Sequence, residues 1–219
     1  MIYTLQTFQI DRKDYSEFIR ITEASRSAQE QRGERIVGVW TVVLGAPERI
    51  LSMSCFDSLI QWQKAQDLPQ EGGISERLKL VKDTQTIVLR PLTRRQPTED
   101  AQGDNPGIYT LRTYKIERKN IDRLVDLSEN HWWHWAERGL RHRPLAQWLS
   151  IMAPETRIYM ISHYDDLAHW EDTRGRAPEP ADPEMRAIWK DGYKAVQERA
   201  AMLIDTNVQI LRPISSWRP

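Results

Sequence analysis

The residues best suited to chemistry gather in one short stretch, Asn130-His131-Trp132-Trp133-His134-Trp135. Imidazole is the natural general acid or base near neutral pH, and indole offers a flat apolar wall for a ring-shaped ligand. On a helix, His131 and Trp135 share one face. The pattern predicts that His131 acts as acid or base and that substrate contacts come from its neighbours Trp132, His134 and Trp135. Indoles packed in the core and histidines on the surface are the alternative.

Four further side chains complete the candidate site. His163 alternates with Ile161 near the end of a predicted strand, which makes it a second candidate acid or base. Arg112 could clamp a carboxylate or oxyanion of a ligand, or form a structural salt bridge. Trp148 and Tyr109 are expected to contact the substrate, although a packing role for Tyr109 is the alternative.

Several kinds of site are excluded by spacing. His131 and His134 are three residues apart, whereas the metalloprotease helix needs histidines four apart with a glutamate beside the first. The single cysteine, Cys55, allows no intrachain disulfide and no cysteine-based zinc site. The sequence contains no phosphate loop, nucleophile elbow or dinucleotide fingerprint. We therefore expect no metal and no dissociable cofactor.

The bulk composition narrows the class of partner. The 219 residues carry 31 basic and 31 acidic side chains, so the basic excess typical of nucleic-acid binders is missing. No apolar run is long enough to cross a bilayer, and a strand predicted from Ile2 leaves no room for a targeting segment. We expect a soluble, cytoplasmic protein that binds a small molecule and neither nucleic acid nor membrane.

The elements that must position these residues occur twice. The segment Ile2-Tyr3-Thr4-Leu5-Gln6-Thr7-Phe8-Gln9-Ile10 returns 106 residues later as Ile108-Tyr109-Thr110-Leu111-Arg112-Thr113-Tyr114-Lys115-Ile116. All five histidines lie in the second copy. If the two copies began alike, this asymmetry points to the second copy as the half that acquired a binding surface.

Each copy predicts the order β-α-β-β-α-β, the ferredoxin-like plan. Strands are expected at 37–44 and 50–56 in the first copy and at 145–152 and 157–164 in the second. The domains are then a first unit at 1–92, a polar linker at 93–106 and a second unit at 107–214. An inserted helix at 184–204 would cover the core or gate a site, with an apolar face formed by Ile188, Trp189, Tyr193, Val196, Ala200 and Leu203.

Three motifs resemble the NIPSNAP family: the opening strand, the segment Val37-Gly38-Val39-Trp40, and the aromatic-Asp-x-Leu start of the second helix at Phe56 and Tyr164. The resemblance covers both copies and implies a dimeric α+β barrel, in which two ferredoxin-like units join their sheets. Such units usually pair between chains. Here the duplication would supply both halves, giving a monomeric pseudo-dimer or a homo-oligomer of it. The second copy departs from the pattern at Gln147, where the first has Val39.

The superfamily implied by this resemblance includes cofactor-free monooxygenases, polyketide cyclases, lactone isomerases and haem enzymes. Fold alone does not select among them. The first hypothesis is a small-molecule enzyme that isomerises, cyclises or oxygenates an aromatic or polycyclic substrate, of the kind found in biosynthesis of secondary metabolites. The alternatives are a haem-binding α+β barrel protein and a non-catalytic ligand-binding or scaffold protein.

Overall fold

The computed structural model describes residues 1–46, 48–68, 73–97, 107–175 and 179–214. The first copy consists of β1 (Ile2–Ile10), α1 (Tyr15–Ala24), α2 (Arg26–Gln31), β2 (Arg35–Leu44), β3 (Arg49–Phe56), α3 (Leu59–Asp67), α4 (Ile74–Lys79) and β4 (Val81–Pro91). Gly33, with φ of 78°, follows α2 in the left-handed conformation that commonly ends a helix.

The second copy repeats this order with a longer final helix. It consists of β5 (Ile108–Ile116), α5 (Ile121–Leu127), a π-helical turn η4 (Ser128–Trp132), α6 (Trp133–Arg138), β6 (Arg143–Ser150), β7 (Arg157–Tyr164), α7 (Leu167–Asp172), α8 (Pro183–Ala201) and β8 (Leu203–Pro213). The predicted helix at 184–204 is thus α8, with one correction. Leu203 belongs to β8 instead of the helix face, because the chain turns after Ala201.

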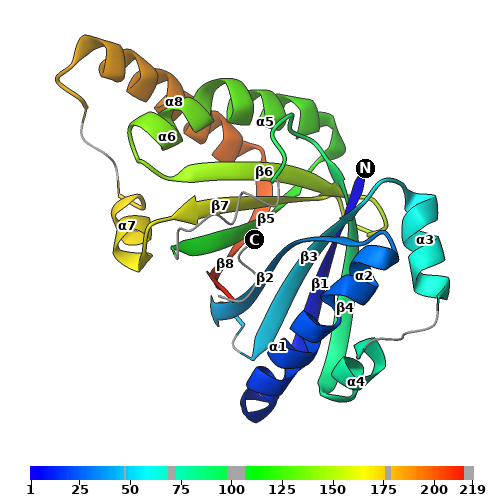
Figure 1. Ribbon diagram of the computed structural model, residues 1–219. Helices are drawn as coiled ribbons and strands as arrows, with labels where there is room; N and C mark the ends of the chain where they lie inside the picture. The colour runs from blue at the N-terminus through cyan, green and yellow to red at the C-terminus, as the bar shows by residue number, and fades with distance from the viewer. Residues whose placement is uncertain (47, 69–72, 98–106, 176–178, 215–219) are drawn as a thin grey trace.

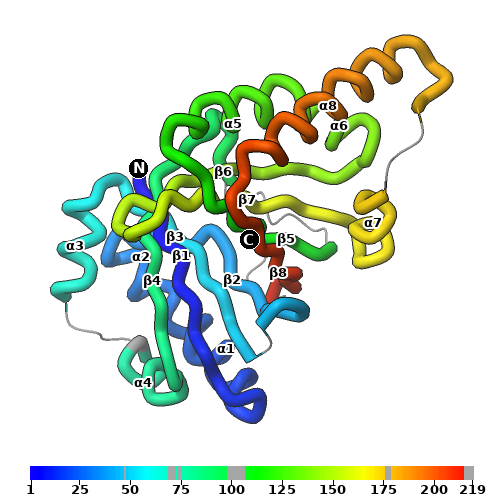
Figure 2. The backbone as a smooth tube through the Cα atoms, turned by 180° about the vertical axis from the view of Figure 1, so that it is seen from behind, coloured from blue at the N-terminus to red at the C-terminus, as the bar shows by residue number. Residues whose placement is uncertain are grey.

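The eight strands close into one antiparallel barrel in the order β1-β3-β2-β8-β5-β7-β6-β4. Each copy contributes four neighbouring strands, and the copies join where β2 pairs with β8 and β4 pairs with β6. The helices lie outside the barrel (Figures 1 and 2), those of the two copies on different sides of it. The predicted fold of two ferredoxin-like units forming a pseudo-dimeric α+β barrel is confirmed. Most of the predicted linker, from residue 98 onward, lies outside the described residues.

Strand alternation separates an inner from an outer side-chain layer. On β5, Tyr109 and Leu111 join the core inside the barrel. Tyr114 and Ile116 point the other way and pack with the helix residues Ile121 and Leu124. Arg112 has the same parity as Tyr114, so its side chain lies on the outer face of the sheet, toward the helices.

Two aromatic pairs connect the copies inside the barrel. Tyr3 of the first copy packs on Trp148 of the second at 5.4 Å between ring centroids, and Trp40 packs on Tyr109 at 5.8 Å. The interplanar angles, 59° and 57°, are nearly equal. Tyr3 occupies the same position in its copy as Tyr109, and Trp40 the same as Trp148. The barrel interior therefore preserves the twofold relation that the sequence repeat predicts.

Candidate functional site

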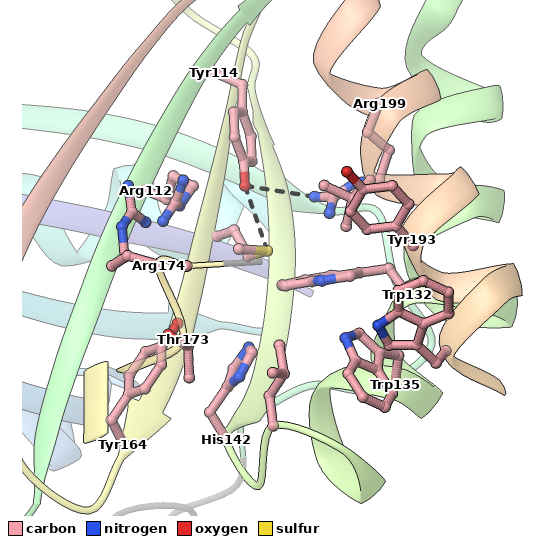
Figure 3. A pocket seen from close by; sticks show the side chains of 15 residues that line it. Arg112, Tyr114, Trp132, Trp135, His142, Tyr164, Thr173, Arg174, Tyr193 and Arg199 are labelled. Carbon is pink, nitrogen blue, oxygen red and sulfur yellow. Dashed lines mark hydrogen bonds between the residues drawn. The ribbon is translucent and has the colours of Figure 1, made fainter. Parts of the chain in front are cut away.

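A cavity of about 380 Å³ lies in the second copy, between the outer face of the sheet and the helices α6 and α8 (Figure 3). The sheet contributes Arg112 and Tyr114 from β5 and Met160 and Tyr164 from β7. Alternation along each strand places these four side chains on one face. The segment after α7 completes this side of the cavity with Thr173, Arg174 and Gly175.

The opposite wall is aromatic. Trp132 from η4 and Trp135 from α6 face the cavity beside Trp189 and Tyr193 of α8, and the last two rings stack at 5.5 Å with an interplanar angle of 10°. The helix α8 can approach because Gly192 lies directly against Trp135. Planar π surfaces on this side suit a flat, ring-shaped ligand.

His142 lies between the two walls, in the loop that leads from α6 into β6. Its ring is 2% exposed, stacks on Tyr164 at 4.6 Å and lies 5.5 Å from Trp132. Neither ring nitrogen has a hydrogen-bond partner among the described residues. Burial lowers the pKa of His142 to about 3, with the charges of His169 and Arg112 adding to the effect. The imidazole is therefore neutral at pH 7, and one of its nitrogens can accept a proton.

Three arginines reach the cavity at different depths. Arg199 is 6% exposed and lies over the rings of Trp132, at 4.4 Å, and Tyr114, at 5.8 Å. Arg112 is half-buried, and Arg174 is exposed at the mouth. No aspartate or glutamate lies among the residues that line the cavity, within the described parts of the chain. The lining is thus positively charged, with Arg112 and Arg174 on the sheet side and Arg199 among the rings of the helix side.

Three of the residues predicted from sequence line this cavity: Arg112, Trp132 and Trp135. Two others lie on the same helical segment outside it. The Nδ1 atom of His131 is 2.8 Å from a carboxylate oxygen of Asp191 on α8, and His134 is exposed. The structure thus brings the indoles of the predicted cluster to the cavity and places its histidines elsewhere.

The remaining predicted residues lie inside the barrel. Tyr109 and Trp148 belong to its apolar core, and His163 contacts Tyr109 at 5.0 Å between ring centroids. Burial, followed by the charge of Arg143, lowers the pKa of His163 to about 4. The barrel wall separates these three side chains from the lining of the cavity, so their proposed contact with substrate stays a prediction.

Sequence reasoning did not single out three of the side chains that line the cavity: His142, Tyr164 and Arg199. His142 entered only as part of the short basic run Arg141-His142-Arg143. Arg199 could have been found by comparing the two copies, because Arg77 occupies the same position before the last strand of the first copy. Arg77 is likewise buried, over the rings of Phe8 and Phe18.

Other classes of site receive no support from the described residues. They contain no group of three or more histidine, cysteine, aspartate or glutamate side chains that could hold a metal ion. Within the same residues, no helix is long and apolar enough to span a membrane.

Solved structures similar to this chain share its fold over nearly the full length. A proposed monooxygenase from Lactobacillus acidophilus gives a TM-score of 0.68 at 13% identity, covering 97% of this chain and 93% of that chain. An anthrone oxidase-like protein gives 0.66 at 14%, covering 97% and 91%. A proposed monooxygenase from Fusobacterium nucleatum gives 0.62 at 8%, covering 98% and 92%. At such low identity the likeness establishes the fold.

The likeness to NIPSNAP proteins extends over less than half of the chain. A NIPSNAP domain protein from Burkholderia xenovorans covers 43% of this chain, with a TM-score of 0.37 and 18% identity. A haem-binding protein from Thermus thermophilus covers 99% of this chain and 92% of that chain, with a TM-score of 0.50 and 13% identity. No family model and no curated protein matches the sequence. The matches over nearly the full length are therefore to the two proposed monooxygenases, the anthrone oxidase-like protein and the haem-binding protein.

Proposed function

We propose that this protein is an enzyme that binds an aromatic or polycyclic small molecule in the cavity of its second copy. The reaction class is a cofactor-independent isomerisation, cyclisation or oxygenation of that ring system. The observation that carries the proposal is His142, a neutral imidazole with two unpartnered nitrogens held at the edge of an aromatic cavity. A buried polar group without a partner costs folding free energy, and a catalytic role is one physical explanation for keeping it.

The three reaction types share a first step that these residues can perform. Each begins when an acidic O–H or C–H of an electron-rich ring loses a proton to a base. His142 is positioned to accept that proton. The forming substrate anion raises the pKa of His142 by Coulomb attraction, and the nearby guanidinium of Arg112 stabilises the same anion. The indoles of Trp132 and Trp135 hold the ring and exclude water.

The comparisons support this choice of class. Two of the full-length structural neighbours are described as proposed monooxygenases and one as anthrone oxidase-like. An anthrone is a tricyclic molecule with an acidic C–H, which fits a flat aromatic cavity with a base at its edge.

The test is turnover of a panel of anthrones and polycyclic phenols in air, with products identified by mass spectrometry. His142→Phe keeps the ring stacked on Tyr164 and removes both nitrogens, so we expect turnover to be lost. His131→Ala is the matched variant, since it removes an imidazole outside the cavity. Loss in His131→Ala with activity kept in His142→Phe would return the acid/base role to His131. Binding without any turnover would leave a non-catalytic ligand-binding protein.

Haem binding is a second candidate, favoured by the same imidazole. The donor set fits: a ring nitrogen of His142 would hold the iron, the aromatic walls would hold the macrocycle, and Arg112 and Arg174 would hold its propionates. Haem would supply one-electron and oxygen chemistry at that position. Titration of the protein with haem, followed in the Soret region, tests this candidate. A spectrum equal to that of free haem, or one unchanged in His142→Ala, removes it.

A further inference from the structure

We infer that the ligand of this cavity is an aromatic carboxylate, whose carboxylate group is held by Arg112 and Arg174 while its ring lies against the indoles. This inference names the substrate class of the site and rests on the proposed function. Figure 3 shows the two guanidinium groups on one side of the cavity, facing Trp132 and Trp135 across it.

The first argument is unbalanced charge. Within the described residues, Arg112 and Arg174 form no ion pair, and the cavity lining holds no carboxylate. Burial and the positive charge of Arg112 together lower the pKa of Arg174. The two cations therefore repel each other across a partly desolvated space. An anion placed between them removes that repulsion and gains charge-assisted hydrogen bonds from both.

The second argument comes from comparing the two copies. A buried arginine over aromatic rings occurs in both, as Arg77 and Arg199, so this feature belongs to the fold. Arg112 is different, because the first copy has Gln6 at that position. The cavity lies beside Arg112, whereas at the equivalent place in the first copy Phe8 and Phe18 pack closely, at 5.2 Å between ring centroids. Arg112 and the cavity therefore occur together in the second copy.

The third argument concerns the shape of the anion. Guanidinium is planar and binds carboxylate through two parallel hydrogen bonds. Behind Arg112 and Arg174, the space is bounded by flat rings: Tyr164 and His142 on one side and the indoles on the other. A carboxylate attached directly to a flat ring system can bind the two guanidinium groups while its ring packs against the indoles. The ring then lies beside the nitrogens of His142.

Calorimetric titration with 2-naphthoate and 2-naphthamide at pH 7.5 tests the inference, because the two ligands share a ring and differ in charge. We expect 2-naphthoate to bind at least about tenfold more tightly. Arg112→Gln introduces the residue found in the first copy. It should lower the affinity for 2-naphthoate by about tenfold and leave the affinity for 2-naphthamide unchanged. Arg118→Gln removes the same charge from an exposed position and should change neither affinity.

The outcomes separate this inference from the proposed function. Equal affinity for the two ligands, or no effect of Arg112→Gln, would overturn the inference that the arginines bind a carboxylate. The proposed aromatic binding site would remain. Failure of both ligands to bind the unsubstituted protein overturns the site itself. Equal weakening by Arg118→Gln would show that 2-naphthoate responds to overall charge and would also overturn the inference. Circular dichroism of each variant verifies that the fold is intact.

Discussion

The proposed role of His142 implies a cost in stability. Its two ring nitrogens are buried without hydrogen-bond partners. Loss of hydration at such a buried, unpaired group typically costs about 1–3 kcal/mol of folding free energy. Phenylalanine has a similar shape and needs no hydrogen bond. We therefore expect His142→Phe to raise the free energy of unfolding by about 1 kcal/mol while abolishing turnover. Thermal and denaturant unfolding of the variant give the answer, and a destabilised variant would contradict the prediction.

The same residue makes stability depend on pH in a predictable direction. In the unfolded chain a histidine has a pKa near 6.5, whereas burial lowers that of His142 to about 3 in the folded protein. Between these values the unfolded state binds the extra proton. Stability is therefore complete above pH 6.5 and falls as the pH drops toward 3, by at most about 1.4 kcal/mol per pH unit for this group.

His163 acts in the same direction, since its pKa is lowered to about 4. Denaturation midpoints measured between pH 7.5 and 4.5 should therefore fall for the natural protein and fall less steeply for His142→Phe. Parallel pH profiles for the two proteins would show that His142 is protonated in the folded state and would refute the assignment.

Among the elements of the second copy, one π-helical turn explains why the predicted residue His131 does not line the cavity. Regular helical spacing placed His131 on the face of Trp135. In the structure the turn at Ser128–Trp132 inserts one extra residue, which presents Trp132 to the cavity and leaves His131 beside Asp191. Amino-acid pattern carries no clear mark of such a turn. Comparison of the two copies singled out Arg112, where the first copy has Gln6, and Arg112 lines the cavity.

The π-helical turn also accounts for Gln147, where the second copy departs from the NIPSNAP-like pattern. Its buried side-chain amide donates to the hydroxyl of Ser128 at 3.0 Å, and that hydroxyl donates to the carbonyl of Leu124 at 2.6 Å. The residue that replaces Val39 thus connects β6 to the turn that shapes the aromatic wall.

The packing of α8 on α6 gives a prediction at this scale. A methyl group at Gly192 would lie 2.4 Å from the Cβ atom of Trp135, which is fixed to the backbone and cannot move alone. We expect Gly192→Ala to destabilise the protein by roughly 1 kcal/mol, because overpacking outweighs the higher helix propensity of alanine. It should also weaken ring binding, since Trp135 is displaced. Lys194→Ala, at an exposed position of α8, is the matched control and should do neither.

Over the whole chain, both copies contribute four strands to the barrel, and the second copy also lines the cavity. The repeat was sufficient to predict eight strands and the order of helices and strands along the chain, because each copy carries the same strand and turn signals. It could not predict the cavity. The cavity depends on how α8 packs over β5 and β7, and on contacts between residues far apart in the sequence, such as Tyr114 and Arg199.

The two aromatic pairs that connect the copies inside the barrel allow a test of whether the ligand binds in the cavity or inside the barrel. Trp40 and Trp148 are equivalent positions, both buried and both packed on a tyrosine of the other copy. We expect Trp40→Leu and Trp148→Leu to lower the free energy of unfolding by similar amounts, about 2–3 kcal/mol, below the 3–5 kcal/mol typical of Trp→Ala. Neither should change the affinity for 2-naphthoate, because the barrel wall separates both from the cavity. Loss of binding in Trp148→Leu alone would instead place Trp148 in contact with the ligand and move the site into the barrel.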